Sequence, residues 1–365
     1  MATEPLRHVV RSARGLALLL AAAVALGAGL GVASGPLRAD CPGLAGETVR
    51  WIVPTRPGGG YDAYSRLLQP FLEQALSARV VIENRPEAGG IVGAMAIRDA
   101  EPDGRTLGII NASGLLAANV VDDGKAPDPA ADFTILASIV SNHVVMFSGR
   151  ESGITDIDSL LRLSATRPIV AGVRDAGSMS FYAVPIAAAV LGFDYALVTG
   201  YVGSAARTLA LMRGEVDIVV GHYDSVHSQV QAGELVPLLQ LTGGGSSALA
   251  VPRLASPDGL ARQRATFAGR SPEQAAEDAA ALAALVGAGR LVVAPPGLPG
   301  PLAACLDAAF GKILGSAEFK AAAERARLGV DPLDGRAART EVLAAAQALT
   351  RFETLVRAAV ERARQ

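Results

Sequence analysis

The sequence is poor in the residues on which several large functional classes depend. Among 365 residues there are two cysteines and one tryptophan, and the aromatic residues make up 4% of the chain. Two cysteines, Cys41 and Cys305, cannot build a disulfide framework or a four-thiolate zinc site. Basic and acidic residues nearly balance, at 33 against 35, so no basic, aromatic-rich surface is indicated and we expect no nucleic-acid partner.

Motifs for catalysis are also lacking. The sequence has no G-x-S-x-G nucleophile elbow, which excludes the hydrolases that depend on it. His222, Asp224 and His227 could together present ligands to a metal ion, but residues with this spacing do not share one face of a helix. A turn that lines a cleft is the better interpretation. We therefore expect no enzyme activity, no metal and no cofactor.

The first forty residues resemble a secretory signal. Arg7, Arg11 and Arg14 precede residues 15–37, which carry no charge and are most apolar at 16–26. A membrane anchor is the alternative, but glycine, serine and Pro36 dilute the second half of this stretch. We predict a signal peptide over residues 1–39, cleaved near Ala39, and hence an exported protein. In an exported protein Cys41 and Cys305 could pair or remain two free thiols, and the sequence leaves both open.

After residue 48 the chain alternates short apolar runs with helical patterns. Half of all residues are hydrophobic and 19% are charged, a globular composition. Repeated strand-helix-strand units predict an α/β fold with mainly parallel sheets flanked by helices. The expected strands are residues 49–54, 79–83, 106–110, 168–173, 195–198, 215–220, 235–241 and 290–294, and the expected helices are 61–77, 93–100, 156–163, 178–191, 204–212, 272–286 and three more up to 365.

Two such sets indicate two lobes. The predicted boundaries are residues 40–145 for the first part of lobe 1 and 146–245 for lobe 2. Residues 246–365 are expected to return to lobe 1 and complete it with the C-terminal helices.

Two glycine turns carry the main functional signal. Gly58, Gly59 and Gly60 follow the first strand and open a helix, and Gly89 and Gly90 do the same after the next strand. Glycine turns leave backbone N–H groups exposed at a helix N-terminus, which is an anion site. Because neighbouring parallel strands end at the same edge of a sheet, we expect both turns to face one crevice.

A nucleotide-binding loop is the alternative for the first turn. Residues 58–63 satisfy G-x-G-x-x-[GA], and Glu83 stands where a dinucleotide fold places its ribose-binding acid. The segment 54–57, bounded by Pro54 and Pro57, separates strand from glycines and argues against this match. An exported nucleotide-dependent enzyme therefore stays as a second hypothesis.

Taken in order, these motifs resemble one family. Five motifs of the first half are similar to the N-terminal signature of the tripartite tricarboxylate transporter receptors, or Bug-type solute-binding proteins. They are Trp51-Ile52-Val53-Pro54, Pro57 to Gly60, Glu83-Asn84-Arg85-Pro86, Ala88-Gly89-Gly90 and Pro102-Asp103-Gly104. Three later motifs are similar to the second-lobe motifs of the same family: Gly177-Ser178, Tyr201-x-Gly203 and Gly214-Glu215-Val216-Asp217.

The resemblance implies a periplasmic receptor with a two-lobed periplasmic binding protein fold of the type II kind, its lobes joined by crossing strands. Such a receptor closes on a small carboxylated solute, a di- or tricarboxylate or an aromatic carboxylate, and delivers it to membrane permease subunits. We expect a monomer. With Ser113 and Asp224 added from their positions after strands, the predicted ligand-binding residues are Thr55, Gly59, Gly60, Asp62, Ala88, Gly89, Gly90, Ser113, Gly177, Ser178, Met179, Tyr201, Gly203 and Asp224.

The sequence departs from the family pattern in places that concern the ligand. Glu87 stands beside the second glycine turn, where an acid would repel a carboxylate unless it points away or pairs with Arg85 or Arg56. Residues 252–290 carry an alanine-rich helix in place of an acidic, tryptophan-bearing motif. A receptor fold that has become a partner of a membrane sensor is a third hypothesis.

Overall fold

The computed structural model describes residues 38–121, 124–140, 142–175, 178–201, 203–242 and 249–364. The predicted signal peptide lies outside these residues except for its end, as do Gly177 and the glycine-serine tract at 243–247. Within the described part, no helix is both long enough and apolar enough to cross a bilayer.

The first sheet contains strands from both ends of the chain. Its strand order is β11-β4-β10-β3-β1-β2. The pairings of β1 with β2 and β3 are parallel, whereas β10 runs antiparallel to β3 and β4. The strands are β1 (Thr48–Val53), β2 (Arg79–Asn84), β3 (Thr106–Asn111), β4 (Thr134–Ser138), β10 (Arg290–Ala294) and β11 (Leu333–Asp334).

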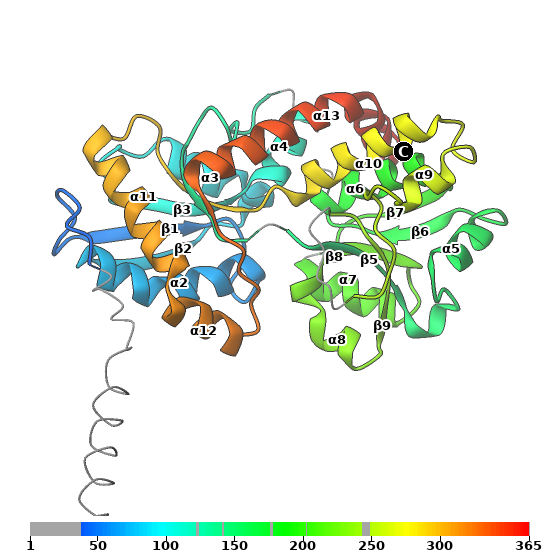
Figure 1. Cartoon of the computed structure of the whole chain (residues 1–365), viewed down its shortest axis with the longest axis horizontal. Helices are drawn as coiled ribbons and strands as arrows, with labels where there is room; N and C mark the ends of the chain where they lie inside the picture. The colour runs from blue at the N-terminus through cyan, green and yellow to red at the C-terminus, as the bar shows by residue number, and fades with distance from the viewer. Residues whose placement is uncertain are drawn as a thin grey trace, which may run out of the picture. The chain divides into compact units, whose positions relative to one another are not determined.

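The second sheet lies in the middle of the sequence. Its order is β7-β6-β8-β5-β9, with β6 parallel to β7 and β8, and β5 antiparallel to β8 and β9. The strands are β5 (Val144–Gly149), β6 (Ile169–Gly172), β7 (Tyr195–Val198), β8 (Ile218–His222) and β9 (Leu235–Gln240). Two sheets, each flanked by helices, confirm the predicted α/β fold with two lobes (Figure 1). Each sheet combines a parallel half with an antiparallel half.

Helices cover both sheets, and several of them contact elements of both lobes. α13 packs against α4 and β4 of the first lobe and against α6 of the second, and α10 packs along α13 and α6. The helices of the first lobe are α2 (Gly60–Leu76), α3 (Ile91–Arg98), α4 (Ala112–Val121), α11 (Gly300–Gly315) and α12 (Ala317–Arg325); the others are α5 (Ile157–Ser164), α6 (Met179–Leu191), α7 (Gly203–Met212), α8 (His227–Gln231), α9 (Leu260–Arg264), α10 (Pro272–Gly287) and α13 (Gly335–Arg364).

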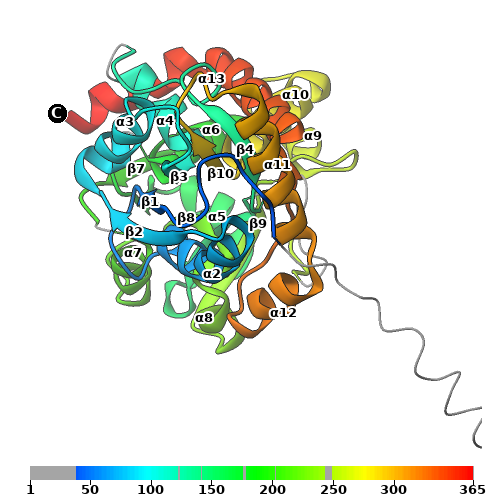
Figure 2. The same cartoon turned by 90° about the vertical axis from the view of Figure 1, so that its left-hand side faces the viewer.

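The alternation of side chains along β1 divides the core of the first lobe. Val49, Trp51 and Val53 pack with α2 and α11, whereas Ile52 packs with α3 and α4 on the other face. Figure 2 shows α2 on one side of this sheet and α3 and α4 on the other. The indole of Trp51 donates a hydrogen bond to Ser65 of α2 at 2.9 Å, which ties the helix to the strand. The beginning of α2 is therefore held at the carboxyl end of β1.

A disulfide ties the start of the described chain to α11. The structure joins Cys41 and Cys305, with 5.4 Å between their Cα atoms, and so answers the question that the sequence left open. The predicted boundaries of the signal peptide and the two lobes stay predictions.

The chain crosses between the sheets twice, in segments that lie side by side. Residues 139–143 lead from β4 to β5, and residues 286–290 lead from α10 into β10. Asn142 donates hydrogen bonds to the carbonyls of Val286 and Ala288 at 3.1 and 2.8 Å. A Cβ atom at Gly289 would lie 2.3 Å from the Val140 carbonyl oxygen, so only glycine allows this approach. The two crossings form one hydrogen-bonded pair.

Candidate functional site

The first glycine loop is held in shape by its own aspartate. Gly58 has a left-handed backbone (φ +83°), and its N–H donates to Asp62 Oδ2 at 2.9 Å. Arg66 and Asn84 donate to the same carboxylate at 2.8 and 3.0 Å. Burial alone would raise the pKa of Asp62, but these hydrogen bonds outweigh it and lower the pKa. Asp62, a predicted ligand residue, thus serves to fix the loop that opens α2.

The second glycine loop lies directly against the first. Asn84 donates to the Thr55 carbonyl at 2.9 Å, and a Cβ atom at Gly90 would lie 2.6 Å from the Pro54 carbonyl oxygen. Ala88, Gly89 and Gly90 all have positive φ. The prediction that both turns meet at one edge of the sheet is confirmed. Backbone N–H groups at the start of α2 and of α3 therefore lie close together.

The acid in the second loop does not pair as one sequence alternative suggested. Arg85 pairs with Glu83 at 2.5 Å, and Arg50 donates to the same carboxylate at 3.0 Å. Glu87 is exposed. Glu83, the acid that a dinucleotide would need, is thus engaged by two arginines, which counts against a nucleotide site.

The second lobe presents the end of β6 to these loops. A Cβ atom at Gly89 would lie 3.9 Å from both Arg174 Nη2 and Asp175 Oδ1, so this segment approaches the second glycine loop. Ser178 precedes α6, and its hydroxyl donates to the Asp175 carbonyl at 2.7 Å. Ser178 and Met179 are buried. Of the predicted second-lobe residues here, Ser178 is bonded to the segment that approaches the loops and Met179 begins α6. Gly177 lies outside the described residues.

Other predicted residues occupy the neighbouring turns. Tyr201 packs beside Gly172, where a Cβ atom would lie 3.4 Å from the ring, and Gly203 begins α7 with φ +81°. Ser113 is fully buried in the first turn of α4 and lies 3.1 Å from Asn111 Oδ1, to which it donates. Ser113 thus follows β3 at the same edge as the glycine loops, as its position predicts.

The sequence interpretation missed the charged centre of the site. Arg290 is 1% exposed and pairs in register with Asn111, the last residue of β3. Its antiparallel strand therefore begins at the edge where the parallel strands end. A lone arginine at the head of an otherwise apolar strand was the signal that could have identified it.

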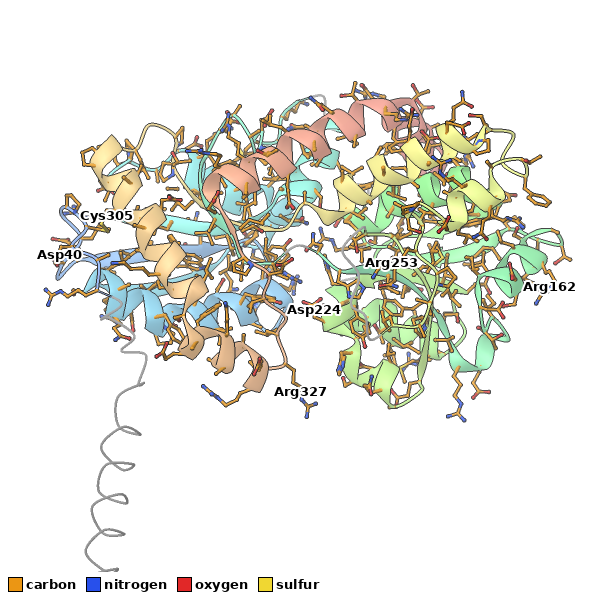
Figure 3. The ribbon with its side chains drawn as sticks, viewed as in Figure 1. Asp40, Arg162, Asp224, Arg253, Cys305 and Arg327 are labelled. Atoms are coloured by element: carbon orange, nitrogen blue, oxygen red, sulfur yellow. A yellow bond between two sulfur atoms is a disulfide. The ribbon has the colours of Figure 1, made fainter. Side chains whose placement is uncertain are left out.

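Arg290 connects the first lobe to Asp224 of the second. Asp224 lies in the 3-10 turn η3 (Tyr223–Ser225) that follows β8. Arg290 Nη1 lies 3.3 Å from Asp224 Oδ2, and Tyr64 Oη lies 3.3 Å from the same oxygen while donating to the Gly329 carbonyl at 2.6 Å. Asp224 thus sits where elements of the two lobes meet (Figure 3).

Burial and nearby cations shape the electrostatics of this region. Burial, with a further contribution from Arg290, lowers the pKa of His222 to about 3. Burial likewise raises the pKa of Tyr61 to about 12 and lowers that of Arg207 to about 10. Although burial raises the pKa of Asp224, the charge of Arg290 and the hydrogen bond from Tyr64 act against it, and the pKa is lowered. Arg207 donates to the Val220 carbonyl at 2.7 Å.

Several buried polar atoms here have no hydrogen-bond partner within the described part of the chain. They are Thr55 Oγ1, Tyr61 Oη, His222 Nδ1, and Arg290 Nε and Nη1. Leaving such groups unpaired is costly. All but His222, which ends β8 of the second lobe, belong to the sheet edge that carries the glycine loops. Their concentration favours binding of a polar, anionic molecule. The same residues offer little for a metal, since no three His, Cys, Asp or Glu side chains in the described ranges are placed to hold one.

Comparisons with known proteins agree with this arrangement. A protein of Pseudomonas sp., described as a UPF0065 protein in the tcbD-tcbE intergenic region, is 28% identical over 184 residues, which cover 50% of this chain and 54% of the relative. The chain spans about half the length of the curated relatives it matches.

Solved structures match over more of the chain. A Rhodopseudomonas palustris protein solved with adipate has a TM-score of 0.67 and 21% identity, covering 86% of this chain and 97% of that one. MatC from the same organism, solved with bound malate, has a TM-score of 0.61 and 22% identity, covering 85% and 99%. At these identities the matches establish the fold.

A family model covers the part of the chain that carries most of these motifs. The model of the tripartite tricarboxylate transporter family receptor matches residues 64–255, just over half of the chain. Family and fold are those of solute-binding proteins, and receptors of this family are periplasmic. This chain belongs to the tripartite tricarboxylate transporter receptor family.

Proposed function

We propose that this protein is an extracytoplasmic receptor that captures a small carboxylated solute and delivers it to the membrane subunits of a tripartite tricarboxylate-type transporter. One observation carries the proposal: two helix N-termini opened by glycine loops meet at one sheet edge, beside the buried cation Arg290. Backbone N–H groups and helix dipoles favour negative charge. The adipate and malate of the two similar structures are acids of this kind.

The remaining predictions belong to the same proposal. The protein is exported by cleavage of residues 1–39 near Ala39, acts as a monomer and carries out no chemistry on its solute. Of the predicted ligand-binding residues on the two glycine loops, Thr55, Gly59, Gly60, Ala88, Gly89 and Gly90 hold one acidic group, while Asp62 fixes the first loop. Ser178, Met179, Tyr201 and Gly203 face the rest of the solute. Lobe closure around the solute would occur at the paired crossings 139–143 and 286–290.

The test is a binding screen of the protein expressed with its own leader and purified from the periplasm. N-terminal sequencing reports cleavage, and thermal shift followed by calorimetry reports binding. The panel pairs adipate, L-malate, succinate and benzoate with their amides. We expect at least one acid to stabilise the protein while its amide does not. Stabilisation by amides or amines alone would refute a carboxylate receptor.

A further inference from the structure

Arg290 is a buried cation whose surroundings hold it in place without using its hydrogen-bonding capacity. Its guanidinium carbon lies 4.7 Å from the ring centroid of Tyr64 and 5.3 Å from that of Tyr61. Both rings belong to the first turns of α2. The face of an aromatic ring attracts a cation electrostatically. It does not accept the hydrogen bonds that a guanidinium donates in its own plane. The two rings fix the orientation of the group and leave its donors for another partner.

Two of the three guanidinium nitrogens of Arg290 have no hydrogen-bond acceptor among the described residues. Nε and Nη1 are buried without a hydrogen bond. Asp224 is the carboxylate nearest to Nη1 in this part of the chain, but at 3.3 Å it forms an ion contact without hydrogen-bond alignment. An arginine that is 1% exposed and incompletely paired is energetically unfavourable. An acidic group from outside the chain would remove this cost by accepting hydrogen bonds from the unpaired donors of Arg290.

The guanidinium also lies at the proposed anion site. A Cβ atom at Gly60, the first residue of α2, would lie 3.3 Å from Arg290 Nη2. The N–H groups of this first helical turn have no partner within the helix. Side-chain and backbone donors thus converge on the same place, although Arg290 is far from the glycine loops in sequence.

We propose that Arg290 is a ligand-binding residue that determines specificity: its guanidinium donates to the acidic group held at the N-terminus of α2 and selects an anion over a neutral group of the same shape. The inference rests on the proposed receptor function and adds a side-chain contact to the backbone donors. Charge-assisted bonds from a guanidinium are about twice as strong as neutral ones. Lysine cannot replace them, because its ammonium lacks the planar fork that fits between two rings and a carboxylate.

The experiment measures the preference for an acid over its amide by calorimetry in the wild type, Arg290→Gln and Arg290→Lys. Arg339→Gln is the matched control, since Arg339 donates to the Ala130 carbonyl at 2.6 Å and lies on α13. We expect Arg290→Gln to weaken binding of the panel acid at least tenfold and to leave amide binding within about threefold. Arg290→Lys should recover only part of the preference, and Arg339→Gln should behave as the wild type.

The outcomes separate the two proposals. If the wild type binds an acid and Arg290→Gln keeps the same acid-to-amide preference, Arg290 is not a ligand contact while the receptor function stands. If the wild type binds no acid, both proposals fall. If the variants do not fold by circular dichroism, the Arg290 Nε–H resonance of the wild type provides the answer: a shift on addition of the acid but not of its amide supports the contact, and an unchanged resonance overturns it.

Discussion

His222 illustrates how single residues in this site depend on their surroundings. It ends β8 and lies among Arg290, Arg207 and Asp224, whose charges all act on it. The pKa lowered to about 3 means that the imidazole is neutral in the folded protein at neutral pH. A neutral histidine keeps one ring nitrogen as an acceptor and the other as a donor. It adds no further positive charge beside the two arginines.

The lowered pKa predicts a loss of stability in mild acid. Between pH 6.5 and about 3 the unfolded chain binds a proton at His222 that the folded chain does not, so the free energy of unfolding falls as the pH falls through this window. His222→Gln should reduce the loss between pH 7 and pH 5 by about 2 kcal/mol. Urea denaturation at both pH values measures this.

The exposed His227 supplies the control for that experiment, because His227→Gln removes a histidine outside the buried cluster. His143, whose pKa is lowered chiefly by burial, contributes in the same direction, so a residual slope should persist in His222→Gln. Equal slopes for wild type and His222→Gln would contradict the assignment.

At the scale of elements, the two glycine loops work as one unit. Each loop follows a parallel strand and opens a helix, and the second rests on the backbone of the first at Pro54. Glycine is required at position 90 for two reasons: the backbone φ is +97°, and there is no room for a Cβ atom. Gly58 also has positive φ, but no atom lies within 4 Å of its Cβ position.

This difference predicts unequal effects of two alanine substitutions. Gly58→Ala should cost about 1 kcal/mol, the cost of a left-handed backbone at a residue with Cβ. Gly90→Ala should cost roughly 3 kcal/mol, since the loop must also move away from Pro54, and should weaken binding of the panel acid. Chemical denaturation and calorimetry measure both. Similar losses in the two variants would show that the loops are not in close contact.

Local patterns predicted most elements of the first lobe, and uniform burial concealed others. The strand predicted at residues 49–54 and the helix at 61–77 agree with β1 and α2 to within one residue at each end. Neither α4 nor β4 was predicted. Residues 112–118 of α4 are all buried, so the helix has no polar face from which its period could be recognised. The short α9 inside the turn-rich segment after Pro252 was missed for lack of length.

The glycine loops were predictable because each is a local motif after a strand. The cluster of Tyr61, Tyr64, Asp224 and Arg290 was not, because its members come from three distant parts of the chain. Strand register places Arg290 opposite Asn111 in the first sheet, and Asp224 contacts it from the second lobe. Single residues such as Asp224 could be placed after a strand, but their partners could not.

At the scale of the whole molecule, long-range connections hold distant parts of the chain together. The largest hydrophobic cluster includes Ile110 of the first sheet, Val144 of the second and Val342 of α13. The crossings at 139–143 and 286–290 are hydrogen-bonded to each other. The disulfide, at a sequence separation of 264, closes the chain from residue 41 to residue 305 into one loop and leaves α12 and α13 outside it.

Loss of this disulfide should lower stability substantially. A cross-link over so long a loop restricts the unfolded chain strongly, and we expect the Cys41→Ser, Cys305→Ser double variant to lose about 2–5 kcal/mol. Urea denaturation with and without dithiothreitol measures the effect. The reductant should destabilise the wild type and leave the double variant unchanged. Because the bond lies on α11, away from Asp224 (Figure 3), affinity for the panel acid should persist.

The position of Arg290 at the end of a crossing segment has a consequence for how such a receptor could diversify. Its backbone N–H donates to the Val140 carbonyl at 3.3 Å, so the residue belongs at once to the proposed hinge and to the proposed recognition surface. A lineage that exchanged this arginine while adapting to a different nutrient would alter the balance between open and shut forms in the same mutational step.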